Sequence, residues 1–158
     1  MSIDEIISRL STYIEGEIPS DAITAAKENW AKFLPHISQV MNKFINDENC
    51  LTEDEYNFLL FGVFLLAEQK EHSHFELLLK LCDRDDSYDS SLNTLFGDVL
   101  TELVASFLYI LADRRQAELI TFMLSEQAGF YVKSAVLSAI FAQYDANEVL
   151  NLQEVVMV

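Results

Sequence analysis

The sequence is poor in the residues that make turns. Its 158 residues include four glycines and two prolines, too few for the many tight turns of a β-sandwich or barrel. No segment shows the sustained alternation of apolar and polar residues that is typical of a half-buried strand. These absences exclude a turn-rich all-β fold.

Basic residues are also scarce. Ten lysines and arginines stand against 26 aspartates and glutamates, which gives a formal net charge of −16 at pH 7. Nucleic-acid phosphates and anionic membranes repel such a chain, so we expect neither as a partner. The charge favours another protein, a basic one, as the partner.

Cysteines and long apolar runs are few. Cys50 and Cys82 stand far apart with no Cys-x-x-Cys pair, so they indicate neither a zinc ligand set nor a disulfide framework. The longest apolar stretch, residues 58–67, has about half the length of a membrane span. The N-terminal segment is acidic where a signal peptide would be basic. We expect a soluble, cytoplasmic protein without a metal or other cofactor.

Apolar residues make up 51% of the chain, and they recur at helical spacing. The first stripe consists of Ile3, Ile6, Ile7, Leu10, Tyr13 and Ile14. It predicts an N-terminal helix with a capping box at Ser2 and Glu5 and a stop at Gly16. A second helix is predicted to begin at Ser20 and to continue until Pro35 ends or bends it.

Helix start signals recur along the rest of the chain. Each pairs a capping residue with an acceptor three positions later: Thr52 with Glu55, Ser73 with Glu76, Asp113 with Gln116, and Asp145 with Glu148. Strongly apolar segments at 58–67, 103–112 and 135–142 each precede one of the last three signals. Because one helical hairpin cannot bury both of its faces, this recurrence predicts stacked hairpins.

The predicted fold class is therefore all-α. We expect one helical-repeat domain over residues 1–158, with N-terminal helices in 1–46 and stacked hairpins, an α-solenoid, in 52–158. A compact helical bundle is the alternative.

One segment, Leu95-Phe96-Gly97-Asp98-Val99-Leu100-Thr101-Glu102, is distinctive. It resembles the Leu-Gly-Asp-x-x-Thr-Glu signature of the bacterial domain-of-unknown-function family 1186. Weaker likenesses to that family extend over residues 18–144, at 18–19, 56–60, 65–69, 77–79 and 131–133. The resemblance implies a HEAT-like helical-repeat fold and no established biochemistry. Many members continue into a cysteine-rich zinc-binding tail, and this sequence reaches Val158 without such cysteines.

The signature segment is the first candidate site. Asp98 and Glu102 lie four positions apart, so a helix would place both carboxylates on one face. Together with Thr101 they would position Mg²⁺, Mn²⁺ or a hydrolytic water. The same segment also fits a helix start, in which Gly97 makes a positive-φ turn and Asp98 is the cap. Thr101 and Glu102 would then satisfy early amides, and we favour this second interpretation.

The second candidate site is an acidic segment that contains Asp83, Asp85, Asp86 and Asp89. It lacks the Asp-x-Asp-x-Asp-Gly order and the closing glutamate of a calcium loop. We interpret it as a solvated loop that attracts a basic partner. His36, which follows Pro35, is interpreted as an ordinary surface or capping residue.

The sequence contains no nucleophile elbow, phosphate-binding glycine loop or His-Glu-x-x-His helix. We therefore favour a protein–protein interaction module with an acidic surface over an enzyme. The alternative is a divalent-metal-binding protein or metal-dependent hydrolase centred on Asp98 and Glu102. Mimicry of nucleic acid by rows of carboxylates is a weaker third hypothesis.

Overall fold

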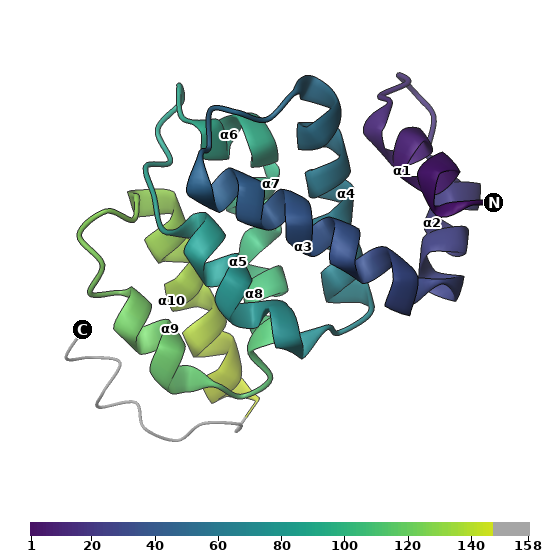
Figure 1. The fold of residues 1–158 in the computed structure, drawn as a ribbon. Helices are drawn as coiled ribbons and strands as arrows, with labels where there is room; N and C mark the ends of the chain where they lie inside the picture. Colours follow the sequence, from purple (N-terminus) through teal and green to yellow (C-terminus); the bar gives the residue numbers. More distant parts are fainter. Residues whose placement is uncertain (147–158) are drawn as a thin grey trace. The chain divides into compact units, whose positions relative to one another are not determined.

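The computed structural model describes residues 1–146, and within them the chain forms α-helices and one short 3₁₀ helix, with no strand (Figure 1). The prediction of an all-α fold is confirmed. The chain divides into two compact units, Met1–Gln69 and a second that begins at Lys70. No helix within the described residues is long and apolar enough to cross a membrane.

Four helices build the first unit. They are α1 (Ile3–Ser11), α2 (Ser20–Glu28), α3 (Trp30–Asn46) and α4 (Glu53–Glu68). Helix α1 packs on both α2 and α4, and α3 packs on α4. The large side chains that are fully buried here are Ile6, Leu10, Phe33, Ile37, Met41, Phe44, Leu59 and Leu66. Their helical spacing is the pattern that the sequence shows.

Helix α1 is shorter than its apolar stripe predicts. It ends at Ser11, and the side chains of Tyr13 and Ile14 are 73% and 49% exposed. The hydroxyl of Ser11 donates to the carbonyl of Ile7, and Thr12 leaves the helix with extended backbone angles. The hydroxyl of Thr12 donates to the carbonyl of Ser8 at 3.0 Å, which a longer helix would have used for a backbone hydrogen bond.

The second predicted helix is broken at Asn29 into α2 and α3. The prediction that this helix ends at Pro35 is therefore wrong. Asn29 is the C-cap of α2 and the N-cap of α3, and its side-chain amide donates to the carbonyl of Ala25 at 2.9 Å. Pro35 lies inside α3, where it removes one N–H from the helix ladder. The local hydrogen bonds of Asn29 decide the boundary.

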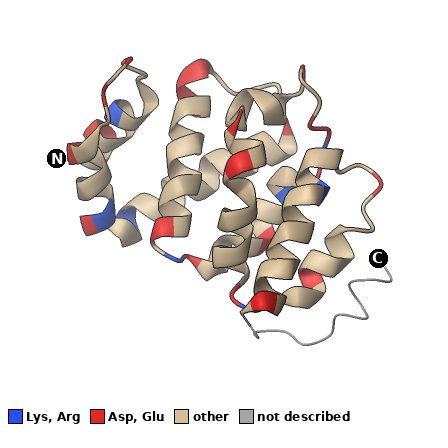
Figure 2. Ribbon diagram, turned by 180° about the vertical axis from the view of Figure 1, so that it is seen from behind, with Lys and Arg blue, Asp and Glu red and all other residues tan. Residues whose placement is uncertain are grey.

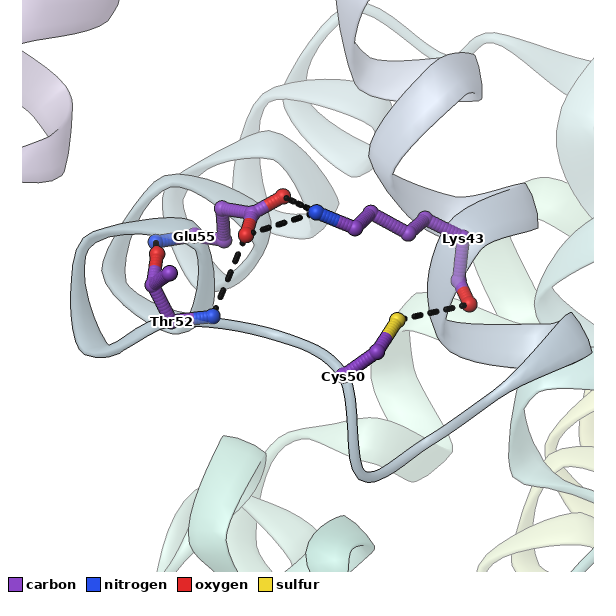
Figure 3. Close-up of polar contacts among 4 residues, drawn as sticks. All are labelled: Lys43, Cys50, Thr52 and Glu55. Atoms are coloured by element: carbon purple, nitrogen blue, oxygen red, sulfur yellow. Dashed lines mark hydrogen bonds and ion pairs between the residues drawn. The ribbon is translucent and has the colours of Figure 1, made fainter.

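The start of α4 confirms the predicted capping box (Figure 3). The hydroxyl of Thr52 accepts from the amide of Glu55 at 3.2 Å, and the Glu55 carboxylate accepts from the amide of Thr52 at 3.1 Å. Lys43, near the end of α3, donates to both carboxylate oxygens of Glu55 at 2.9 and 2.7 Å. These bonds join the end of α3 to the start of α4. The capping box at Ser2 and Glu5 is confirmed too.

The second unit begins with a 3₁₀ turn, η1 (His72–His74). Its helices are α5 (Phe75–Cys82), α6 (Ser91–Phe96), α7 (Val99–Glu102), α8 (Val104–Ala112), α9 (Gln116–Phe122) and α10 (Phe130–Asp145). Helix α10 packs along α8 and α9, and α5 packs on α8. The three strongly apolar segments that the sequence shows fall on α4, α8 and α10.

Three predicted start signals are not helix caps. Ser73 lies in the 3₁₀ turn, and its hydroxyl donates to Glu71. Asp113 is the C-cap of α8 in the left-handed conformation, which short polar side chains tolerate better than most. Asp145 is the last residue of α10, and Glu148 lies outside the described residues. The same residue types serve helix ends and turns, so their spacing alone misleads.

We predict that Thr52→Ala lowers the free energy of unfolding by about 1 kcal/mol, because α4 loses its side-chain cap. Urea unfolding at neutral pH measures this loss. Thr24→Ala is the matched control, since Thr24 is exposed in the middle of α2 and alanine favours a helix interior. Equal losses in the two variants would contradict the role of Thr52.

The Lys43–Glu55 pair predicts a pH dependence. Burial favours a higher pKa for Glu55, but hydrogen bonds from Lys43 and Thr52 outweigh it and hold that pKa below 4.5. The hydrogen bond to Glu55 raises the pKa of Lys43 above 10.5. The pair therefore stabilises the fold between these two pH values and stops doing so as pH falls through the lowered pKa or rises through the raised one.

Lys43→Met should therefore be less stable than the wild type at pH 7, with a difference that shrinks below pH 4.5 and above pH 10.5. Unfolding curves across the pH range test this. The control is Lys32→Met, because Lys32 is exposed on the same helix and pairs with no described residue. A pH-independent loss in Lys43→Met would contradict the pair.

Candidate functional site

The acidic segment of residues 83–90 connects α5 to α6, and one of its aspartates is buried. Asp86 is 5% exposed, and its carboxylate accepts a hydrogen bond of 2.8 Å from the amide of Val132, 46 residues further along. Val132 lies in the first turn of α10, where amides have no partner within the helix. Asp86 therefore caps α10 from a distant part of the chain, where the helix dipole favours a negative charge.

Gly129 makes room for this contact. It is the N-cap of α10 and has no side chain with which to cap the helix itself. A Cβ atom at this position would collide with the carboxylate of Asp86. The amide of Gly129 donates to the carbonyl of Arg84 at 3.1 Å. Glycine is needed here for space, since its φ of −75° is open to any residue.

Asp83 adds a second attachment of the acidic loop to the chain before α10. Its carboxylate accepts from the hydroxyl of Ser125 and, at 3.0 Å, from the side-chain amide of Gln127. Ser125 and Gln127 belong to the connection between α9 and α10. Asp83 and Asp86 together hold the acidic loop against residues 125–132.

The remaining two aspartates are exposed. Ser87 donates to Asp85 through its hydroxyl at 2.6 Å and its amide at 3.3 Å, and these hydrogen bonds lower the pKa of Asp85. Asp89 is exposed as well. The four aspartates that the sequence groups together therefore divide into an inward pair, Asp83 and Asp86, and an outward pair, Asp85 and Asp89.

Exposed aromatic side chains accompany the outward pair. Tyr88, in the loop, is 88% exposed, and Phe130 and Tyr131, at the start of α10, are 75% and 48% exposed. The rings of Phe130 and Tyr131 meet edge to face, with centroids 5.6 Å apart. We call Asp85, Tyr88, Asp89, Phe130 and Tyr131 the loop–α10 surface.

None of the sequence patterns described above singled out these aromatics as functional residues. A signal was present: Tyr88 stands within the acidic segment, and Phe130 and Tyr131 directly follow Gly129, outside the apolar stripe of α10. Acidic residues are spread over the helices and loops of the described chain, and basic ones are few (Figure 2). The loop–α10 surface combines this acidity with exposed apolar area.

The signature segment is placed at the junction of α6 and α7. Gly97 has a φ of +51°, and its amide donates to the carbonyl of Asn93 at 2.7 Å, so the predicted positive-φ turn is confirmed. Asp98 precedes α7, but its carboxylate makes no capping hydrogen bond. Its backbone is already helical, with φ of −65° and ψ of −22°, whereas a side-chain cap needs extended angles. Asp98 therefore takes the predicted N-cap position of α7, but its side chain does not cap the helix.

The prediction that Thr101 satisfies an early amide of the helix is wrong, because its hydroxyl bonds to a carbonyl. The hydroxyl of Thr101 donates to the carbonyl of Asp98 at 3.1 Å, and the side chains of Asp98, Thr101 and Glu102 are exposed. Among residues 1–146 no three or more His, Cys, Asp or Glu side chains gather so that they could hold a metal ion. Asp98 and Glu102 thus have no third His, Cys, Asp or Glu ligand in this part of the chain.

We predict that Gly129→Ala lowers the free energy of unfolding by about 1–3 kcal/mol, because the new methyl group forces Asp86 away from the Val132 amide. Asp86→Ala should have a loss of similar size. In the double variant the two losses should not add, since both remove one interaction.

Urea unfolding of the single and double variants measures this coupling. Asp85→Ala is the control for the removal of a loop carboxylate, because Asp85 is exposed, and it should change stability by less than about 0.5 kcal/mol. Additive losses at Gly129 and Asp86 would contradict the contact.

The chain has relatives among curated proteins. It is 27% identical over 145 residues to an uncharacterised protein of Chlamydia trachomatis serovar D, a match that covers 90% of this chain and 55% of the relative. An uncharacterised protein of Chlamydia muridarum is 27% identical over 143 residues, with 89% and 55% covered. The chain spans about half the length of these relatives. No solved structure matches it significantly.

A family model settles the assignment. The model described as a protein of unknown function, DUF1186, matches residues 1–158, in agreement with the resemblance carried by residues 95–102. The chain therefore belongs to the DUF1186 family.

Proposed function

We propose that this chain is a protein–protein interaction module whose loop–α10 surface binds a basic segment of another protein. The observation that carries the proposal is that the four loop aspartates have two different environments. Asp83 and Asp86 bind their own chain, whereas Asp85 and Asp89 are exposed beside Tyr88.

Charge supports a basic partner. The chain carries a formal net charge of −16, so lysine- and arginine-rich surfaces are attracted to it and encounter it faster than neutral ones. The same charge opposes nucleic acids and anionic membranes. We infer a partner that is a protein, with Asp85 and Asp89 among its contacts.

Exposed aromatic side chains support a binding surface, because they add apolar contact area to its charge. Tyrosine and phenylalanine are enriched at protein interfaces, where they supply apolar contact area with few rotatable bonds. Phe130 and Tyr131 already contact each other. We infer that they anchor apolar residues of the partner while the loop carboxylates bind its cations, an arrangement that also suits cation–π contacts.

The loop is held in place before any partner binds, which supports its role as the binding segment. Hydrogen bonds from Ser125, Gln127 and Val132 hold Asp83 and Asp86 in place, and Ser90 caps α6 at the other end of the loop. A surface that is already ordered loses less conformational entropy on binding. A smaller loss of conformational entropy favours tight binding through a short loop.

The proposal also includes the arrangement of the helices and the location of the protein. We infer a HEAT-like repeat arrangement, from the family resemblance and the recurring apolar helices, and a cytoplasmic location, from the composition. We favour a binding module over an enzyme, because the sequence offers an acidic surface and no recognised catalytic motif.

Affinity capture from a bacterial lysate, quantified by mass spectrometry at low and moderate salt, tests the proposal. The wild type should retain a basic protein, and retention should weaken with salt, because the screening length falls to about 10 Å at 0.1 M. Asp85→Asn with Asp89→Asn should lower the retained amount several-fold. Phe130→Ser should lower it at both salt concentrations, since its contact is apolar.

The matched control is Asp98→Asn with Glu102→Gln, which removes the same charge from exposed positions outside the loop–α10 surface. It should retain the partner at nearly the wild-type level. The retained protein is then purified and titrated against all variants by fluorescence anisotropy. Equal binding by the wild type and the loop variant would refute the surface, and loss in the control alone would place the contact at the signature segment.

A further inference from the structure

Helices α1, α3 and α4 of the first unit line a half-open hollow of about 290 Å³. Its lining residues are Ile7, Ser11, His36, Gln39, Val40, Lys43, Asp54, Glu55 and Phe58. Sites for small molecules typically begin at about 300 Å³ and combine apolar walls with a few polar groups. The hollow has this composition at the small end of the range.

Three polar side chains in the hollow have no protein partner. His36, Gln39 and Asp54 make no hydrogen bond or ion pair with any residue that the structure describes. By contrast, Lys43 and Glu55, which also line the hollow, bind each other (Figure 3). A ligand in the hollow would therefore find donors on His36 and Gln39 and an acceptor on Asp54 without breaking an existing contact.

The donors on α3 and the acceptor on α4 lie at different heights along the two helices. Lys43 pairs with Glu55, and a Cβ atom at Gly62 would lie 3.0 Å from Ile37, so α3 and α4 run antiparallel. His36 lies seven residues before Lys43, or about 10 Å along α3. Asp54 lies one residue beyond Glu55 on the other side, so the backbones of His36 and Asp54 are about 12 Å apart along the helix axes.

This separation selects the length of a ligand with opposite charges at its ends. A residue in an extended chain spans about 3.3–3.6 Å, so a dipeptide spans about 7 Å, and a hydrogen bond of about 3 Å at each end brings the total to about 13 Å. A single amino acid with its two hydrogen bonds spans about 10 Å, which reaches from Asp54 to Gln39 but not to His36. Between the ends, Ile7, Val40 and Phe58 offer apolar contacts.

We propose that the hollow between α1, α3 and α4 binds a zwitterionic dipeptide with apolar side chains, its ammonium group on Asp54 and its carboxylate on His36 and Gln39. The charges that line the hollow suit this occupant, since Lys43 and Glu55 neutralise each other and leave Asp54 to bind a cation. This site is independent of the loop–α10 surface, because all its residues belong to the first unit.

Isothermal titration calorimetry with alanyl-leucine tests the proposal. The wild type should bind with one saturable site. Asp54→Asn and His36→Ala should each weaken binding at least about tenfold, the effect of losing one hydrogen bond to a charged group. Glu53→Gln and Lys32→Ala are the matched controls on the same two helices, at exposed positions that do not line the hollow, and they should bind like the wild type.

The ligand series separates the parts of the claim. N-acetyl-alanyl-leucine amide lacks both charges and should not bind, and free leucine should bind at least about tenfold more weakly, because it cannot span both ends. No saturable heat with alanyl-leucine, binding unchanged in Asp54→Asn, or equal affinity for the uncharged derivative would overturn the proposal. Thermal unfolding of every variant confirms that a loss of binding is not a loss of fold.

Discussion

The hydrogen bond between the carboxylate of Asp86 and the amide of Val132 is the constraint on which the second unit's surface depends. It supplies the cap that Gly129 lacks, and it brings the acidic loop to the start of α10. Because Asp86 is buried there, its neighbours Asp85 and Ser87 are left on the outside. The position of Phe130 and Tyr131 follows from the same start of α10. One buried carboxylate thus sets the helix start, the course of the loop and the composition of the exposed surface.

The acidity of the chain therefore has two different uses. Asp83 and Asp86 satisfy donors of their own chain, as the buried carboxylate of Asp86 must. Glu55 does the same at the start of α4, where it caps the helix and binds Lys43. Asp85 and Asp89 leave their charge on the surface, and Asp54 lines a hollow without a partner among the described residues. Composition alone does not separate these roles, since it gives one net charge for all of them.

The sequence predicted what depends on neighbours along the chain. The all-α class, the capping boxes at Thr52 and Ser2 and the positive-φ turn at Gly97 rest on contacts within a few residues, and each is confirmed. Asp113 and Asn29 show the limit of local signals, because a short polar side chain suits a helix start, a left-handed end or a break equally well. The contact of Asp86 with Val132 spans 46 residues, and the hollow needs three helices. Neither leaves a mark in local spacing, so both required the packed structure.

Amide hydrogen exchange at Val132, followed by NMR, tests the central claim most directly. Residues in the first turn of a helix normally exchange fast, because their amides have no partner within the helix. With its amide bound to the buried carboxylate of Asp86, Val132 should instead exchange as slowly as the interior of α10. Slow exchange at Val132 that becomes fast in Asp86→Ala is the predicted result. Fast exchange at Val132 in the wild type would contradict the anchored loop and, with it, the surface built upon it.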